Sequence, residues 1–225
     1  MLVFILCVAC TGFYQDDPYK ETRMKMVKTQ IKARGVSDEA TLNAMNKVPR
    51  HKFVPSKAAN YAYHDGPLSI GYGQTISQPY IVAYMTEKLQ LKSTDKVLEV
   101  GTGSGYQAAV LSEIVDHVYT IEIIEDLGNE AKSRLSKLGY KNVHVIIDDG
   151  YYGYEEQSPY DAIIVTAAAE LIPPPLVKQL KEGGKMIIPV GSPFAIQYLI
   201  LVEKRKGKTV TRNLIPVRFV PFTRK

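Results

Sequence analysis

A glycine-rich loop between an apolar segment and an amphipathic one constrains this chain most. Val97–Val100 reads as a short buried strand, and Gly101, Gly103 and Gly105 follow it at alternate positions. Tyr106–Val115 then carries apolar residues at helical spacing, which predicts a helix. Glycine has no Cβ and adopts positive φ at little cost, so such a loop lets the backbone approach a ligand closely. We therefore expect a ligand site at the carboxyl edge of an α/β sheet.

An acidic residue just ahead of this loop indicates the charge of the ligand. Glu99 would repel the pyrophosphate of a dinucleotide, and the glycine spacing differs from the dinucleotide fingerprint G-x-G-x-x-G. A cationic ligand fits better. The pattern resembles the first motif of the S-adenosylmethionine-dependent methyltransferases, whose cofactor carries an ammonium and a sulfonium. A tight strand–helix turn that binds no ligand is the alternative.

Two further acids follow predicted strands. The strand 118–121 ends in Glu122, one βα unit beyond the glycine loop, where an acid binds ribose hydroxyls in such folds. The strand 143–147 is followed by Asp148, Asp149 and Gly150, and a strand-end acid there can accept a hydrogen bond from the adenine amine. Taken alone, Glu122 is equally well explained as a solvated strand-end acid. Together with Glu99, it indicates a cofactor site.

The order of the elements predicts the fold class. Further strands are expected at 160–165 and 185–190, with helices at 125–138 and 173–181, and such alternation is typical of a parallel, doubly wound sheet. We predict a Rossmann-like methyltransferase sheet with N-terminal helices and a C-terminal β-hairpin, which turns at 204–208. The expected organisation is a candidate signal or disordered segment at 1–15 and a single domain at 16–225, divided into a helical cap and substrate loop (16–90), a cofactor-binding core (91–192) and C-terminal strands (193–225).

The segment before the sheet predicts two helices and a loop. Pro18–Arg34 has one apolar helical face and stops at Gly35, and Ser37 is expected to cap a second helix. Residues 60–80 are rich in Gly, Pro, Ser and Tyr, which favours an irregular binding loop. Pro79 suits the first position of the next helix. Ser77 would then lie near a helix N-terminus, either as a simple cap or beside a bound anion.

Taken together, these features resemble the bacterial-type protein-L-isoaspartate O-methyltransferases. The resemblance runs from about Lys20 to the C-terminus, and it is carried by the segments 48–55, 73–80, 97–105, 159–169 and 217–221. The family usually has Gly-Asp-Gly where this chain has Asp148-Asp149-Gly150, so the extra acid is a departure. The resemblance implies Ser77 as the active-site residue. It implies a cofactor site of Glu99, Gly101, Thr102, Gly103, Gly105, Glu122, Asp149, Gly150 and Thr166, and a substrate site of Ile76, Ser77, Gln78, Pro79, Val217 and Val220.

This resemblance implies a reaction and a cofactor. The family transfers the methyl group of S-adenosylmethionine to the free α-carboxyl of L-isoaspartyl residues in damaged proteins, and the ester then collapses through a succinimide. A carboxylate is already ionised at neutral pH, so no general base is needed. One alternative is a methyltransferase that acts on a small molecule. Another is a non-catalytic nucleotide-binding module, against which the three acids argue.

Composition excludes some partners. The net charge of +5 is modest and the basic residues are scattered, which does not favour nucleic-acid binding. The two cysteines, Cys7 and Cys10, cannot form a metal set. Met1–Cys10 is apolar but too short to span a membrane. It lacks a basic start, so a cytoplasmic protein is expected, with a periplasmic or lipid-anchored protein as the alternative if this segment is a signal. A monomer is expected.

Overall fold

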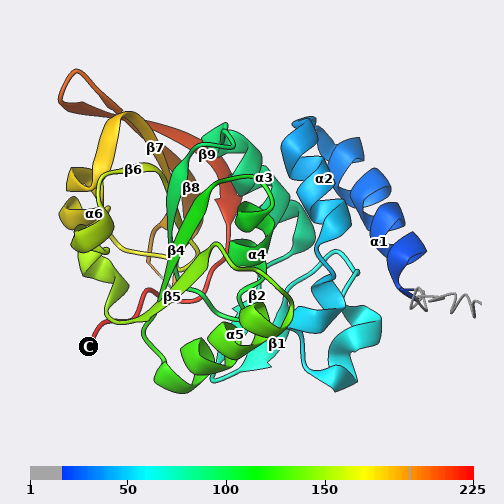
Figure 1. The fold of residues 1–225 in the computed structure, drawn as a ribbon. Helices are drawn as coiled ribbons and strands as arrows, with labels where there is room; N and C mark the ends of the chain where they lie inside the picture. The colour runs from blue at the N-terminus through cyan, green and yellow to red at the C-terminus, as the bar shows by residue number, and fades with distance from the viewer. Residues whose placement is uncertain (1–16, 193) are drawn as a thin grey trace, which may run out of the picture.

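A seven-stranded sheet forms the centre of the molecule (Figure 1). The computed structural model describes residues 17–192 and 194–225, so the candidate signal Met1–Cys10 lies outside the described residues. The strand order is β5-β4-β3-β6-β7-β8-β9, in which neighbours from β5 to β7 are parallel and β8 and β9 are antiparallel additions. The predicted fold class is confirmed. The strands are β3 (Lys96–Val100), β4 (His117–Glu122), β5 (Val143–Ile147), β6 (Tyr160–Val165), β7 (Leu180–Val190), β8 (Gln197–Arg205) and β9 (Lys208–Val217).

The central strands are apolar along their length because both faces of the sheet are covered. Successive residues of β3 alternate between two cores, so that Val97 belongs to one and Leu98 to the other. The first core also contains residues of α3 (Pro79–Leu89), α4 (Tyr106–Ser112) and α5 (Glu125–Lys137). The second includes Leu176 of the short helix α6 (Pro174–Lys178). This burial fixes the strands and places their carboxyl ends at one edge.

The N-terminal helices pack on the first core. The first predicted helix consists of three consecutive segments: α1 (Lys20–Met26), a π-helical turn at Val27–Ile31 and a 3₁₀ turn at Lys32–Arg34. It ends at Gly35, as expected. The second helix is α2 (Glu39–Lys47), but Ser37 does not cap it. Asp38 does, because its carboxylate accepts a hydrogen bond from the Thr41 N–H at 2.8 Å. The Ser37 N–H instead donates to Glu87 of α3, so it ties the two helices together.

Two other predicted elements differ in the structure. The helix predicted to reach residue 181 ends at Lys178. Strand β7 begins at Leu180, earlier than predicted, because Leu180 pairs with Tyr160 of β6; a register shift in this pairing follows. The loop expected at residues 60–80 contains an antiparallel hairpin of β1 (Leu68–Gly71) and β2 (Gln74–Ile76). Short 3₁₀ turns lie at Arg50–Phe53, Ser56–Tyr61, Gly150–Tyr152 and Glu155–Gln157.

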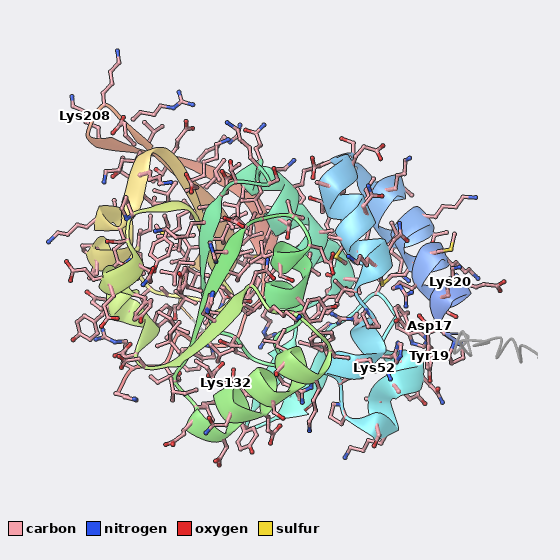
Figure 2. The ribbon with its side chains drawn as sticks, in the orientation of Figure 1. Asp17, Tyr19, Lys20, Lys52, Lys132 and Lys208 are labelled. Atoms are coloured by element: carbon pink, nitrogen blue, oxygen red, sulfur yellow. The ribbon has the colours of Figure 1, made fainter. Side chains whose placement is uncertain are left out.

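The C-terminal hairpin forms one edge of the sheet. Strands β8 and β9 meet at a two-residue turn in which Lys206 and Gly207 both have positive φ, within the turn predicted at 204–208. Figure 2 shows Lys208 at the tip of this hairpin, on the opposite side of the molecule from Asp17 and Tyr19. Among the described residues, no helix is both long and apolar enough to cross a membrane.

Candidate active site

A cleft lies at the carboxyl edge of the sheet and holds about 560 Å³ of empty space up to its open mouth. Its floor comes from the segments that follow β3, β4, β5 and β6, as the topology of such sheets requires. One wall comes from β2 and another from the segment after β9. The residues that line it are Gln74, Thr75, Val100, Gly101, Gly103, Ile121, Glu122, Ile123, Ile124, Gly150, Thr166, Ala167, Val220, Pro221, Phe222 and Thr223. We call this the cofactor cleft.

Thr166, which directly follows β6, holds the glycine loop in place. The Thr166 hydroxyl donates to the Gly101 carbonyl at 2.6 Å. Gly101 has φ +99°, and a Cβ there would lie 2.4 Å from Thr166 Oγ1. Any side chain at position 101 would therefore be strained and would collide with Thr166. Because position 101 is a glycine, the loop can pack against Thr166 and stay out of the cleft.

Glu122 organises the same loop from β4. Its carboxylate accepts hydrogen bonds from the Gly103 N–H at 2.8 Å and from the Ile123 and Ile124 N–H groups at 3.0 Å each. The residue is only 5% exposed, so it is not the solvated strand-end acid of the alternative interpretation. A carboxylate has about four acceptor positions, which leaves capacity for a ligand hydroxyl. Glu122 therefore both lines the cleft and fixes the loop that forms its floor.

Glu99 is fully buried beneath the loop and does not line the cleft. The Thr120 hydroxyl donates to Glu99 Oε2 at 2.5 Å, and the hydroxyls of Thr102 and Thr120 are 2.7 Å apart. The other oxygen, Oε1, has no hydrogen-bond partner among the described residues. Burial raises the pKa of Glu99 to about 8; the Thr120 hydrogen bond opposes this rise and the charge of Glu122 adds to it. A buried acceptor without a partner fits a donor or cation that arrives with a ligand.

The acids after β5 have different environments. The side chain of Asp149 is 6% exposed, whereas that of Asp148 is 69% exposed. Asp149 accepts from the Tyr151 N–H at 3.0 Å and from Arg224 Nε at 2.8 Å. Burial opposes ionisation of Asp149, but these hydrogen bonds and the Arg224 charge outweigh it, so its pKa lies below the ordinary value. Asp148 is not among the residues with positive φ, so the departure from glycine leaves the turn unstrained.

A second cleft adjoins the first and holds about 750 Å³ of empty space up to its mouth. It is lined by Pro67, Thr75, Ser77, Gln78, Ile81, Thr166, Pro216, Val217, Arg218, Phe219 and Val220. Thr75, Thr166 and Val220 line both clefts. Ser77 is half-buried and precedes Gln78, the N-cap residue of α3. No side chain caps α3, so Ser77 is not the cap of that helix.

The structure thus gathers most of the predicted residues around two adjoining clefts. Gly101, Gly103, Glu122, Gly150 and Thr166 line the first, and Ser77, Gln78, Val217 and Val220 line the second. Glu99, Thr102, Gly105, Asp149, Ile76 and Pro79 lie outside both linings.

Sequence reasoning missed several wall residues. Gln74 and Thr75 lie within the segment 73–80 that carries the family resemblance, so their proximity could have been inferred from it. Phe222, Thr223 and Arg224 carry no local signal in the sequence, because their position depends on how the chain returns after β9.

Comparison with known proteins identifies the family. Residues 21–225 match the family described as protein-L-isoaspartate(D-aspartate) O-methyltransferase. The chain belongs to this family. It is 60% identical over 207 residues to protein-L-isoaspartate O-methyltransferase 1 of Nitrosospira multiformis, a match that covers 91% of this chain and 88% of that protein. It is 54% identical over 224 residues to the protein-L-isoaspartate O-methyltransferase of Opitutus terrae, a match that covers 100% of this chain and 96% of that protein.

Solved structures agree with this assignment. A protein-L-isoaspartate O-methyltransferase structure superposes with a TM-score of 0.81 at 32% identity and covers 90% of this chain, which spans 65% of that longer chain. A Plasmodium falciparum relative, described in complex with S-adenosyl-L-homocysteine, has a TM-score of 0.79 at 28% identity. The match covers 90% of this chain and 99% of that chain. The predicted family, fold and enzyme class are confirmed: the chain is a methyltransferase of the isoaspartate family, which uses S-adenosylmethionine.

Proposed function

We propose that the two clefts of this chain carry out the reaction of its family, with S-adenosylmethionine in the cofactor cleft and an L-isoaspartyl residue of a protein or peptide in the second cleft. The observation that carries this assignment is the shared wall of Thr75, Thr166 and Val220. Two ligands in clefts that share a wall can bring their reacting atoms together without solvent between them. The small-molecule alternative has no comparable support from the relatives.

The residues of the cofactor cleft fit the proposed cofactor. Glu122 retains acceptor capacity for ribose hydroxyls, and Asp149, which precedes the lining residue Gly150, can accept from the adenine amine. The unpartnered Glu99 Oε1 lies buried beneath the loop, so the cofactor's ammonium would act on it through the loop. When bound, the cofactor supplies an electrophilic methyl group on its sulfonium. Gly101 and Gly150 also line this cleft, and a Cβ at either position would collide with Thr166 or Val100, so both must be glycine for these segments to pack as they do.

On the substrate side, the protein orients a nucleophile that is already charged. The isoaspartyl carboxylate has a pKa near 4, so it needs no base at neutral pH. The Ser77 hydroxyl, which makes no hydrogen bond within the described residues, can donate to this carboxylate and aim one oxygen toward the shared wall. The segment 216–220 forms the facing wall, where backbone groups can bind an extended peptide without reading its side chains.

A paired assay tests this function. Methyl incorporation is measured for several isoaspartyl peptides of unrelated sequence and for their aspartyl counterparts. In an aspartyl peptide the carboxylate lies one methylene further out, and a misplacement on the order of 1 Å can cost about a hundredfold in rate. We expect the aspartyl peptides to be nearly inert. Comparable rates on both isomers would refute the isoaspartate assignment and support a general carboxyl methyltransferase.

We further propose that residues 16–225 act as a single domain and that the enzyme is a cytoplasmic monomer. One chain supplies the residues of both clefts, so one copy suffices for the reaction. Sedimentation of the full chain tests the monomer. Fractionation of cells that express it tests the location, and recovery outside the cytoplasm would support the signal interpretation of Met1–Cys10.

A further inference from the structure

The segment after β9 crosses the cofactor cleft as a strap, which we define as residues 220–225. Figure 1 shows this segment, in red, turning back from β9 across the lower part of the molecule. It is first anchored beyond β6, where the Ala168 N–H donates to the Val220 carbonyl and the Phe222 N–H donates to the Ala168 carbonyl, both at 2.8 Å. It then reaches Asp149, which follows β5.

The sheet topology shows what lies between these two anchor points. In the strand order β5-β4-β3-β6, the carboxyl ends of β3 and β4 separate Ala168 from Asp149. Three strand spacings amount to about 14 Å, which is about the reach of four extended residues. The strap therefore spans the ends of the two strands that carry the glycine loop and Glu122. Its residues 220–223 line the cleft throughout.

Opposite charges fasten the far end of the strap. Arg224 Nε donates to Asp149 Oδ2 at 2.8 Å, and its guanidinium carbon lies 3.7 Å from the centre of the Tyr151 ring. The Lys225 N–H donates to the same Asp149 oxygen at 3.4 Å, and Lys225 Nζ lies 4.0 Å from Asp148. Two acids thus face two bases. The extra acid at position 148, where the family usually has glycine, adds to this attraction.

The fastening leaves room for a ligand on Asp149. Its carboxylate has about four acceptor positions, and Tyr151, Arg224 and Lys225 use three of them. The Arg224 side chain is 40% exposed, so it covers the acid from the solvent side. A nucleoside that donates to Asp149 would therefore lie beneath the strap and need not displace it.

We propose that the strap closes over the bound cofactor and that the Arg224–Asp149 pair is its latch, so that cofactor enters and product leaves only when the latch opens. The inference rests on the proposed function, because it takes the cleft to hold the cofactor. A latch of this kind sets the rate of exchange in both directions and has little effect on affinity. It also makes the exchange rate depend on ionic strength, because the Arg224 side of the pair is reached by solvent.

Exchange kinetics of single variants test the latch. Enzyme loaded with tritiated S-adenosylmethionine is chased with excess unlabelled S-adenosylhomocysteine, and release is followed by rapid filtration at low and high salt. We expect Arg224→Gln and Arg224→Ala to release label about fivefold faster than the wild type at low salt, the upper order of effect of an ion pair with one exposed partner. Association should quicken by a similar factor. Added salt should speed release from the wild type more than from the variants, which keep only the Lys225–Asp148 contact at 4.0 Å.

Control variants separate a latch from a general effect of charge, of folding or of cofactor affinity. Arg205→Gln removes the exposed Arg205–Glu203 pair at the far hairpin and should release label at the wild-type rate. Arg224→Gln keeps the length of the side chain, and urea unfolding checks that it folds. Unchanged release from both Arg224 variants would overturn the latch. Tighter binding with unchanged release would also overturn it, because Arg224 would then compete with the adenine. Failure of the wild type to retain any label would refute the cofactor assignment itself.

Discussion

Removal of the Glu122 carboxylate should damage the loop as well as the cofactor site. The carboxylate accepts three backbone hydrogen bonds, at 2.8, 3.0 and 3.0 Å. Hydrogen bonds to a charged group contribute roughly 1.5–3 kcal/mol each, but water in the cleft can replace part of them. We therefore expect Glu122→Ala to lower the free energy of unfolding by about 2–4 kcal/mol. Cofactor affinity should fall at least about tenfold, because the ribose contacts are lost too.

The matched variant Glu122→Gln separates the two roles. The amide oxygen can still accept from the Ile123 and Ile124 N–H groups, but the amide nitrogen would face the Gly103 N–H, and two donors repel. The glycine loop should therefore shift while the strand end stays intact. We expect a loss of unfolding free energy of about 1–2 kcal/mol, with a weakening of cofactor binding close to that of the alanine variant.

Urea unfolding and calorimetric titration with S-adenosylhomocysteine measure both effects on the same preparations. The reasoning fails if Glu122→Ala unfolds at the same urea concentration as the wild type, because the three backbone donors would then not depend on this carboxylate. It fails differently if both variants lose stability but bind the cofactor normally. That result would keep Glu122 as a structural residue and remove its role in ribose recognition.

Four further substitutions test neighbouring parts of the site. Ser77→Ala should keep cofactor affinity and lower turnover on isoaspartyl peptide by roughly ten- to a hundredfold, through loss of one aiming hydrogen bond; a loss of cofactor binding would contradict this role. Asp149→Asn should weaken cofactor binding and Asp148→Asn should leave it near the wild-type value, with the reverse order showing that the wrong acid was assigned. Gly150→Ala should destabilise the fold by about 1–3 kcal/mol in thermal unfolding, because its Cβ would lie 2.4 Å from Val100 Cγ1.

The sheet could be predicted closely because its strands are buried on both faces. A mainly apolar run has few other structures available, and the strand predicted at 160–165 matches β6 (Tyr160–Val165) at both ends. The start of β7 was less predictable. Lys181, Glu182, Gly183 and Gly184 are not a strand pattern, and only pairing with Tyr160 before a register shift brings Leu180 into the strand. The Ser37 cap was wrong by one residue because two adjacent side chains could both cap the helix.

The site was predictable to the extent that topology alone determines it. Acids at the ends of parallel strands must meet at one edge, so the neighbourhood of Glu122 and Asp149 followed from their spacing. The burial and the hydrogen-bond partners of the acids could not be inferred from this spacing. The burial of Glu99 below the loop depends on packing around Thr120, and the Arg224 contact depends on a chain segment that returns from the far side of the sheet. Such contacts between distant segments leave no periodic pattern in the sequence.

The buried Glu99 gives a last prediction, on stability. Its pKa of about 8 lies above its ordinary value of 4.5, mainly because burial penalises the charge. Between these values the unfolded chain is ionised while the folded chain keeps its proton, so the free energy of unfolding should fall as the pH rises from about 4.5 to 8. Glu99→Gln cannot titrate and should lack this slope. Urea unfolding at several pH values measures the difference, and parallel profiles would contradict the raised pKa.

The same proton should report on cofactor binding. At pH 7 a carboxyl with this pKa is protonated in about nine molecules out of ten. A cofactor ammonium that reaches the unpartnered Oε1 favours the ionised form, so binding should release close to one proton. Calorimetric titrations in two buffers of different ionisation enthalpy count the protons released, and Glu99→Gln provides the baseline for the ligand's own titration. Equal proton release from both proteins would show that the cation does not act on Glu99, and the buried acid would then serve only the packing beneath the loop.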